Sequence, residues 1–127
     1  MSWDTRSLPP AYDTLAPDGS EIRLLGRIRG ASLVHCRLPP GKVTQAVRHR
    51  TVEEAWYCIG GMGELWRRVG ADSATVALRP GVSVTIPLGV EFQFRNTGAT
   101  PLELVIATAP PWPGADEAIA VDGIWAR

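Results

Sequence analysis

The residues of this chain best suited to do chemistry are His49 and Glu54, in the stretch PPGKVTQAVRHRTVEEAWYCIGGMG (residues 39–63). An imidazole and a carboxyl group can act as general base and acid, or can supply two of the ligands of a divalent metal ion. A buried carboxylate needs a partner, so the two could also form a purely structural hydrogen-bonded pair. Catalysis, metal binding and a structural pair therefore remain three open hypotheses.

Two extended segments must position this pair. Residues 42–50 follow a Pro-Pro-Gly turn and are predicted to form a strand that ends near His49. Residues 55–59 are predicted to form a buried strand, closed by the glycines that follow. Because an isolated hairpin is at best marginally stable in water, both strands must belong to a larger sheet. His49 and Glu54 are therefore expected at a short turn into a buried strand, where a small β-barrel would place a pocket.

The chain around this hairpin consists of short extended runs separated by glycine and proline turns. The further predicted strands cover residues 21–29, 31–38, 64–69, 74–79, 82–86, 91–95 and 102–108. Roughly nine short strands at this spacing are typical of an all-β sandwich or barrel, and no segment has the periodicity of an amphipathic helix. The predicted organisation is an N-terminal arm (1–20), a barrel (21–108) and a C-terminal arm (109–127).

Both arms carry large aromatic side chains in irregular sequence. Trp3 lies in the first arm, whereas Trp112 and Trp125 lie in the second among prolines that prevent regular strand pairing. Such tryptophans are expected to be anchors. The arms either wrap a neighbouring subunit or fold back onto their own barrel, and the sequence favours neither.

Composition narrows the classes of partner. The 127 residues contain 13 basic and 13 acidic side chains, so the chain offers no basic stripe for a nucleic acid. No apolar run is long enough to span a membrane, and the first residues lack the pattern of a secretory signal. The two cysteines, Cys36 and Cys58, lie in apolar segments and are expected to be buried free thiols. We therefore expect a cytoplasmic protein whose partners are small molecules rather than nucleic acids or membranes.

The spacing of glycines and prolines resembles that of the cupin superfamily over about residues 38–108. In the first cupin motif, Gly41 is followed by five residues, Val47, Arg48 and His49, then by four residues, Glu54, six residues and Gly61. In the second, Gly81 leads to Pro87 and Gly89, then Phe92, and finally Asn96. The resemblance implies a double-stranded β-helix, the jelly-roll barrel of small cupins, usually paired as a homodimer.

The same resemblance implies a metal centre that this sequence does not retain in full. A typical cupin binds one divalent ion through three histidines and one glutamate, but Val47 and Phe92 occupy two of the histidine positions. His49 and Glu54 remain, and Glu91 is a candidate third ligand if a bulge near Pro87–Gly89 turns its side chain inward. Such a set would suit Fe, Mn, Zn or Ni, although a barrel without metal is equally open. Gln45, Gln93 and His35 are further candidates.

The remaining candidate residues predict a largely apolar barrel interior. Strand parity places six side chains there as a ligand-binding set: Gln45, Val47, Trp56, Cys58, Phe92 and Phe94. Beside such rings, the pKa of Glu54 should be raised unless His49 or a metal offsets the burial. The expected function is binding of a small organic molecule. The alternatives are a metal-dependent oxygenase, isomerase or lyase acting on a small organic acid or sugar, and a metal-free sensor or structural dimer module without catalysis.

Overall fold

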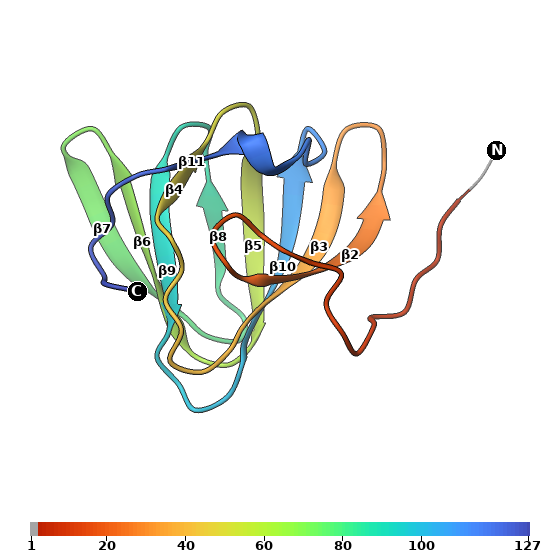
Figure 1. The fold of residues 1–127 in the computed structure, drawn as a ribbon, viewed down its shortest axis with the longest axis horizontal. Coiled ribbons are helices and arrows are strands. Elements are labelled where there is room, and N and C mark those ends of the chain that lie inside the picture. The colour runs from red at the N-terminus through yellow and green to blue at the C-terminus, as the bar shows by residue number, and fades with distance from the viewer. Residues whose placement is uncertain (1–2) are drawn as a thin grey trace.

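Two antiparallel sheets lie face to face and enclose the interior of the barrel in the computed structural model, which describes residues 3–127 (Figure 1). The six-stranded sheet has the order β1-β2-β3-β10-β5-β8, and the five-stranded sheet has the order β11-β4-β9-β6-β7. The strands are β1 (Thr14–Leu15), β2 (Glu21–Arg27), β3 (Ser32–Leu38), β4 (Val47–His49), β5 (Glu53–Gly60), β6 (Gly63–Val69), β7 (Asp72–Leu78), β8 (Ser83–Ile86), β9 (Glu91–Asn96), β10 (Leu102–Ala109) and β11 (Ala118–Ala120). A short 3-10 helix, η1 (Ala115–Glu117), precedes β11.

Strand alternation decides which side chains enter the barrel. In β5, Trp56 and Cys58 are buried whereas Ala55, Tyr57 and Ile59 are exposed, the pattern of a strand with one face on a core. Strand β10 lies between β3 and β5, so that Ile106 pairs with both Val34 and Trp56. The predicted all-β jelly-roll architecture is confirmed.

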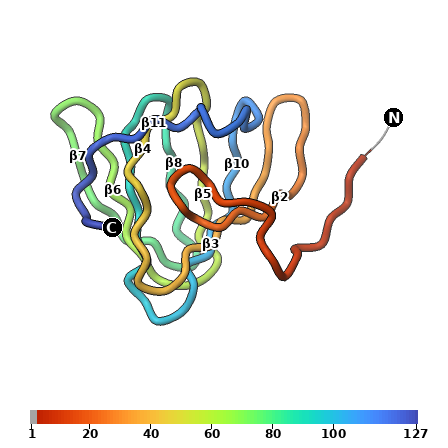
Figure 2. Tube along the Cα trace, viewed as in Figure 1, coloured from red at the N-terminus to blue at the C-terminus, as the bar shows by residue number. Residues whose placement is uncertain are grey.

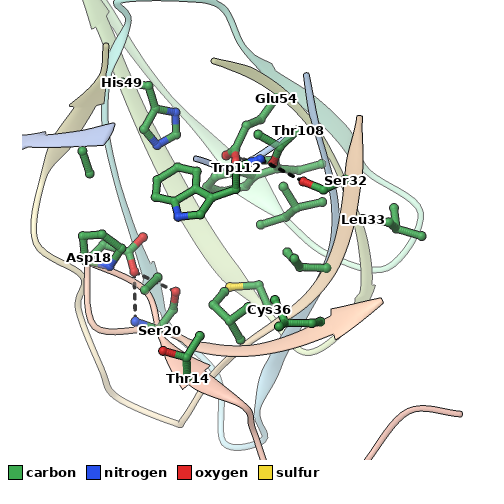
Figure 3. A pocket seen from close by; sticks show the side chains of 18 of the residues that line it. Thr14, Asp18, Ser20, Ser32, Leu33, Cys36, His49, Glu54, Thr108 and Trp112 are labelled. Carbon is green, nitrogen blue, oxygen red and sulfur yellow. Dashed lines mark hydrogen bonds between the residues drawn. The ribbon is translucent and has the colours of Figure 1, made fainter. Parts of the chain in front are cut away.

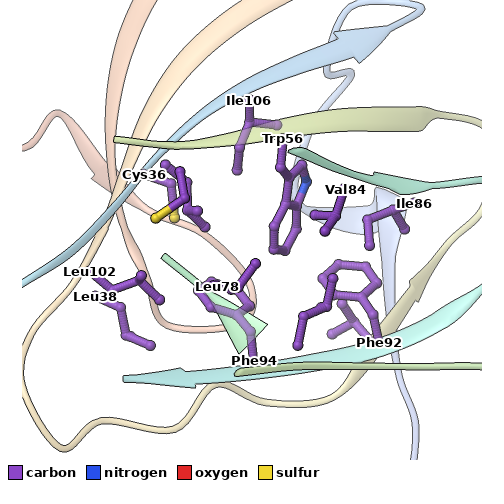
Figure 4. Close-up of a cluster of buried hydrophobic side chains, with 14 residues drawn as sticks. Cys36, Leu38, Trp56, Leu78, Val84, Ile86, Phe92, Phe94, Leu102 and Ile106 are labelled. Carbon is purple, nitrogen blue, oxygen red and sulfur yellow. The ribbon is translucent and has the colours of Figure 1, made fainter. Parts of the chain in front are cut away.

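One part of the interior is filled by side chains (Figure 4). Five leucines from four strands pack there with almost no exposed surface: Leu38, Leu65, Leu78, Leu102 and Leu104. Gly63 is needed beside them, because a Cβ atom on this residue would collide with the carbonyl oxygen of Arg95. This close approach of two backbones explains a glycine inside a strand.

The C-terminal arm folds back onto its own barrel. Strand β11 extends the five-stranded sheet by pairing with β4, and the last residues run beside the barrel to end near β9 and β6 (Figure 2). Gln93 fixes this tail from the outer face of β9, because its side-chain oxygen accepts hydrogen bonds from the backbone of Ile124 and Trp125 and its amide donates to the carbonyl of Trp125. The Arg95 guanidinium lies 4.3 Å from the centre of the Trp125 ring. Trp125 is thus an intramolecular anchor.

The N-terminal arm is attached to the barrel from Arg6 onward, because the Arg6 guanidinium donates a hydrogen bond to the carbonyl of Leu24 in β2. Arg23 of β2 is buried on the outer face of its sheet and donates hydrogen bonds to the carbonyls of Pro9 and Pro10. Before these prolines the chain extends away from the barrel, and Trp3 is 79% exposed (Figures 1 and 2). Trp3 therefore does not pack on its own barrel in the single chain.

The observed strands differ from the predicted set in three places. Strands β1 and β11 fall in the segments predicted to be irregular arms, and β4 covers three residues rather than the nine predicted for 42–50. These short strands pair with β2 and β4 only after the chain has folded back, so no local alternation announces them. Within residues 3–127, no helix is long and apolar enough to cross a membrane.

Candidate functional site

The unfilled part of the barrel interior is a cavity of about 460 Å³ between the two sheets (Figure 3). Its wall is mainly apolar and combines inward-facing residues of the strands with residues of both arms. Several side chains with polar groups interrupt this wall: Thr14, Asp18, Ser20, Arg27, Ser32, Cys36, His49, Glu54 and Thr108. The chemistry of the site depends on how three of them, Glu54, His49 and Asp18, are held.

Glu54 lies at the beginning of β5 and enters the cavity from the six-stranded sheet. One carboxyl oxygen accepts a hydrogen bond from the Trp56 indole at 3.0 Å, and the other accepts one from the Thr108 hydroxyl at 2.7 Å. Burial raises the pKa of Glu54 above its ordinary value of 4.5, and these two hydrogen bonds only partly offset that effect. The site therefore favours the protonated carboxyl more strongly than water does.

His49 ends β4 and enters the cavity from the opposite sheet. Its side chain is 5% exposed and makes edge-to-face contacts with the rings of Phe92 and Trp112, at centroid distances of 5.2 and 5.3 Å. Burial lowers the pKa of His49, although the charges of Glu117 and Asp18 act in the opposite direction. Its Nδ1 is buried and has no hydrogen-bond partner among the described residues. The site thus favours the neutral imidazole more strongly than water does, and its Nδ1 has unused hydrogen-bonding capacity.

Asp18 reaches the cavity from the loop between β1 and β2. One carboxyl oxygen accepts hydrogen bonds from the backbone amide and the hydroxyl of Ser20, at 2.9 and 2.7 Å. Burial raises the pKa of Asp18, and the charge of Glu54 raises it further. The cavity therefore contains a second carboxyl group that sequence analysis did not single out.

The C-terminal arm completes the wall of the cavity. The Trp112 backbone amide donates a hydrogen bond to the Ser32 hydroxyl, which fixes the start of the arm on β3. Further along, Glu117 is 4% exposed and accepts hydrogen bonds from both backbone and side chain of Thr51 and from the backbone of Val52. Figure 3 shows the Trp112 ring close to His49, over the middle of the cavity.

Four of the six predicted ligand-binding residues line this cavity. Val47, Trp56, Phe92 and Phe94 contribute to its wall, and each is at most 3% exposed to solvent. Trp56 makes edge-to-face contacts with both phenylalanine rings, at 5.5 and 5.0 Å. The two predicted catalytic residues, His49 and Glu54, line the same cavity from opposite sheets.

Gln45 and Cys58 lie elsewhere than predicted. Gln45 precedes β4. Its amide donates hydrogen bonds to the carbonyl of the neighbouring Ala46 and to that of Val121 on the C-terminal tail. It therefore does not share the inward direction of Val47, because the strand begins only at that residue. Cys58 does point into the barrel, but it belongs to the packed core rather than to the cavity. Both cysteines are free and buried.

Glu91 is not brought together with His49 and Glu54. Strand β9 pairs with β6 in unbroken register, so Phe92 faces inward and Glu91 faces outward. The Glu91 carboxylate forms an ion pair with Arg68 at 2.6 Å on the outer surface. The bulge that would have turned this carboxylate inward is absent from this pairing.

The donor set does not fit the metal that the cupin resemblance implies. Within residues 3–127, no three His, Cys, Asp or Glu side chains lie close enough together to hold a metal ion. Val47 and Phe92 are paired across β4 and β9, so apolar groups stand side by side where two imidazoles would be required. The other candidate ligands are also occupied elsewhere: His35 lies 3.2 Å from Glu103, and Gln93 fixes the C-terminal tail. The residues present therefore do not form the metal centre of a typical cupin.

Sequence reasoning missed Asp18 and Trp112 as cavity residues. Both belong to the arms, and no strand parity applies to an irregular segment that docks after folding. The available signal was a large aromatic residue among prolines, which indicated an anchor without indicating its position.

Comparison with known proteins places this geometry in a family. The family model described as "Cupin domain" matches residues 34–108. An uncharacterised protein of Methanocaldococcus jannaschii, MJ1618, is 29% identical over 117 residues, which cover 85% of this chain and 90% of that protein. The crystal structure of BH2720 from Bacillus halodurans superposes with a TM-score of 0.67 at 20% identity, covering 80% of this chain and 76% of that one.

A larger structural relative shows the same barrel in an enzyme. Oxalate decarboxylase of Bacillus subtilis, in a structure that concerns its Mn(II) centres, superposes with a TM-score of 0.69 at 13% identity. The match covers 82% of this chain and 28% of the enzyme's chain, so the likeness shows the fold alone. The match to the family model covers more than half of the sequence, and this chain therefore belongs to the cupin domain family.

Proposed function

We propose that this protein binds a small, largely apolar organic molecule in the cavity between its two sheets. The observation that carries the proposal is the cavity itself, because about 460 Å³ stays open while the neighbouring leucine cluster is tightly filled. Sites for small molecules typically enclose roughly 300–1,000 Å³ and combine an apolar wall with a few polar groups. A barrel that served only as a dimer scaffold would gain stability by filling this space.

The polar groups of the cavity suit a ligand that needs few but specific hydrogen bonds. Glu54 and Asp18 favour their protonated forms more than in water, and His49 favours its neutral form. Their positions on different elements allow them to orient a molecule that spans the cavity. This arrangement supports recognition of one or two polar groups on an otherwise apolar body.

A cavity-filling substitution tests the proposal. Val34 lines the cavity on β3 and is only partly buried, so Val34→Phe should occupy ligand space at small cost to the fold. Val105→Phe, on the outward side of the neighbouring strand β10, is the matched control. A compound that binds the native state at about 100 times its Kd adds about 2.7 kcal/mol of stability, which raises the melting temperature by several degrees.

A panel of small neutral, cationic and anionic organic compounds should contain members that stabilise the wild type and Val105→Phe but not Val34→Phe. The proposal is wrong if no compound stabilises the wild type. It is equally wrong if every stabilising compound acts undiminished on Val34→Phe, because binding would then lie outside the cavity.

A second candidate function is proton transfer on the bound molecule. The observation that favours it is that an imidazole with a lowered pKa and a carboxyl group with a raised pKa face one cavity, an arrangement suited to a base and an acid. Deuterium incorporation next to the carbonyl of small ketones in D₂O, followed by NMR, measures such transfer. Catalysed exchange that is lost in both His49→Gln and Glu54→Gln would support it, whereas exchange at the uncatalysed rate in the wild type would remove it.

A further inference from the structure

We infer that the ligand of this cavity is an organic cation, an ammonium group carried on a compact apolar body. The inference rests on the proposed function and goes beyond it by assigning the charge of the ligand. Three independent features of the cavity lead to it: the sign of its charged groups, the aromatic rings in its wall and an unpartnered imidazole.

Two carboxyl groups, and no Lys or Arg side chain of the described residues, are buried inside the cavity. Asp18 and Glu54 enter from different elements; one oxygen of Asp18 and both oxygens of Glu54 accept hydrogen bonds. Among the lining residues in the described chain, the only Lys or Arg is Arg27, which is exposed at the end of β2. An anion placed inside would meet two carboxyl groups without a buried cation to compensate it, whereas an ammonium group would meet two acceptors.

Aromatic rings supply the rest of the environment that an organic cation prefers. Trp56, Phe92 and Phe94 line the cavity from the two sheets, and Trp112 adds a fourth ring from the C-terminal arm. The negative face of an aromatic ring attracts a cation, with the strongest effect at sites removed from water. An apolar wall of this kind also accommodates the hydrocarbon part of the ligand.

His49 is the third feature, a buried imidazole that faces the cavity with a nitrogen left unpartnered within residues 3–127. Its side chain is 5% exposed, lines the cavity, and has an Nδ1 without a partner among the described residues. A buried polar atom without a partner costs free energy, so native structures rarely leave one without reason. In the neutral tautomer that carries its proton on Nε2, Nδ1 offers a lone pair, and an N–H donor on the ligand would satisfy it.

Binding of a cation should release protons from the cavity, which distinguishes it from binding of a neutral molecule or an anion. The titratable groups that face the cavity are Asp18, Arg27, Cys36, His49 and Glu54, with Glu117 acting on His49 from the C-terminal arm. A bound cation would lower the pKa of Asp18 and Glu54, which burial raises in the free protein. Binding would then release protons, so affinity should rise as pH increases and fall as these carboxyl groups become protonated.

The test compares three probes of one shape: benzylamine, benzyl alcohol and benzoate. We expect benzylamine to bind the wild type about tenfold more tightly than benzyl alcohol, because hydrogen bonds to charged groups are the stronger class. Glu54→Gln and Asp18→Asn should each remove most of this advantage, measured as the ratio of benzylamine affinity to benzyl alcohol affinity in the same variant. Glu64→Gln, which alters an outer carboxylate paired with Arg95, is the matched control and should keep it.

The pH dependence is measured on the wild type alone, so it does not depend on whether the variants fold. Benzyltrimethylammonium, whose charge does not titrate, should bind more tightly as pH increases between about pH 5 and pH 8, with protons released to the buffer in calorimetry. Equal binding of benzylamine and benzyl alcohol, or a preference for benzoate, would overturn the inference of a cationic ligand. The proposal that the cavity binds a small organic molecule would still stand. Absence of saturable binding by all three probes at millimolar concentration would overturn both.

Discussion

Glu117 holds the C-terminal arm closed over the cavity, and its removal should loosen the arm by a measurable amount. The carboxylate is buried, and it accepts hydrogen bonds from the Thr51 amide, the Thr51 hydroxyl and the Val52 amide. Burial alone would raise the pKa of Glu117, but the bonds from Thr51 and Val52 outweigh it and lower the pKa below its ordinary value of 4.5. This carboxylate therefore stabilises the fold in its charged form.

The cost of Glu117→Ala follows from these contacts. The substitution leaves the Thr51 and Val52 amides without their acceptor, and each buried donor left unsatisfied costs about 1–3 kcal/mol. Because Thr51 is exposed, water can replace some of its lost hydrogen bonds, and we expect a total loss of about 3 kcal/mol of unfolding free energy. Glu117→Gln retains one carbonyl oxygen for the two amides and should cost about 1 kcal/mol.

Urea unfolding of the three proteins, read by far-UV circular dichroism, measures both differences. Asp116→Ala is the matched control, because Asp116 is the exposed neighbour in η1 and contributes its backbone carbonyl rather than its side chain to Arg50. The stability given by Glu117 is fully present above about pH 4.5 and is lost as pH falls through its lower folded pKa. A Glu117→Ala protein as stable as Asp116→Ala at pH 7, or a difference that persists unchanged in strong acid, would refute the reasoning.

Three further predictions follow from the site and the surface. Glu54→Gln should become more stable relative to the wild type as pH rises above about 4.5, because a raised folded pKa means that the wild type loses stability as pH increases through that pKa; urea midpoints across pH check the sign. The double substitution Val47→His with Phe92→His should create divalent metal binding beside His49 and Glu54, detectable by Co²⁺ absorption, and its absence would show that these positions do not converge. Ile28, 73% exposed on the β2–β3 hairpin, is proposed to meet a second copy of the chain; Ile28→Asp should then lower the mass measured by light scattering, and an unchanged mass would count against that interface.

The jelly-roll fold could be predicted from the sequence because its signals are local. Glycines and prolines at fixed spacings mark turns, and alternation within each strand marks the face that enters the barrel. In β5 this alternation correctly placed Trp56 and Cys58 inside. Strands β1 and β11 could not be found in this way, because two or three residues are too few to show a period and their pairing depends on how the arms return.

The sequence predicted the residues of the candidate site that lie on strands, but not those that lie in loops and arms. His49, Glu54 and Phe92 follow from strand parity, and the structure places all three at one cavity. The prediction of Glu91 as a metal ligand was wrong for the same reason that Phe92 lines the cavity: neighbouring residues on an unbroken strand face opposite sides of the sheet. Asp18 and Trp112 reach the cavity through loops and an arm, where position is set by tertiary contacts rather than by a local pattern.

Val47 and Phe92, at two histidine positions of the cupin motifs, explain why Glu54 is held by hydrogen bonds and has a raised pKa. A glutamate that faces a divalent ion has its charge compensated by that ion, but Val47 and Phe92 leave Glu54 without enough partners to hold one. A buried carboxylate without compensation is costly, and it is relieved by hydrogen bonds or by a proton. Here the Trp56 indole and the Thr108 hydroxyl donate the hydrogen bonds, and the raised pKa of Glu54 means that the carboxyl group takes up a proton more readily. A cation that replaces this proton would bring compensating charge back to Glu54, which is why the charge of the ligand, more than its shape, should decide what this cavity binds.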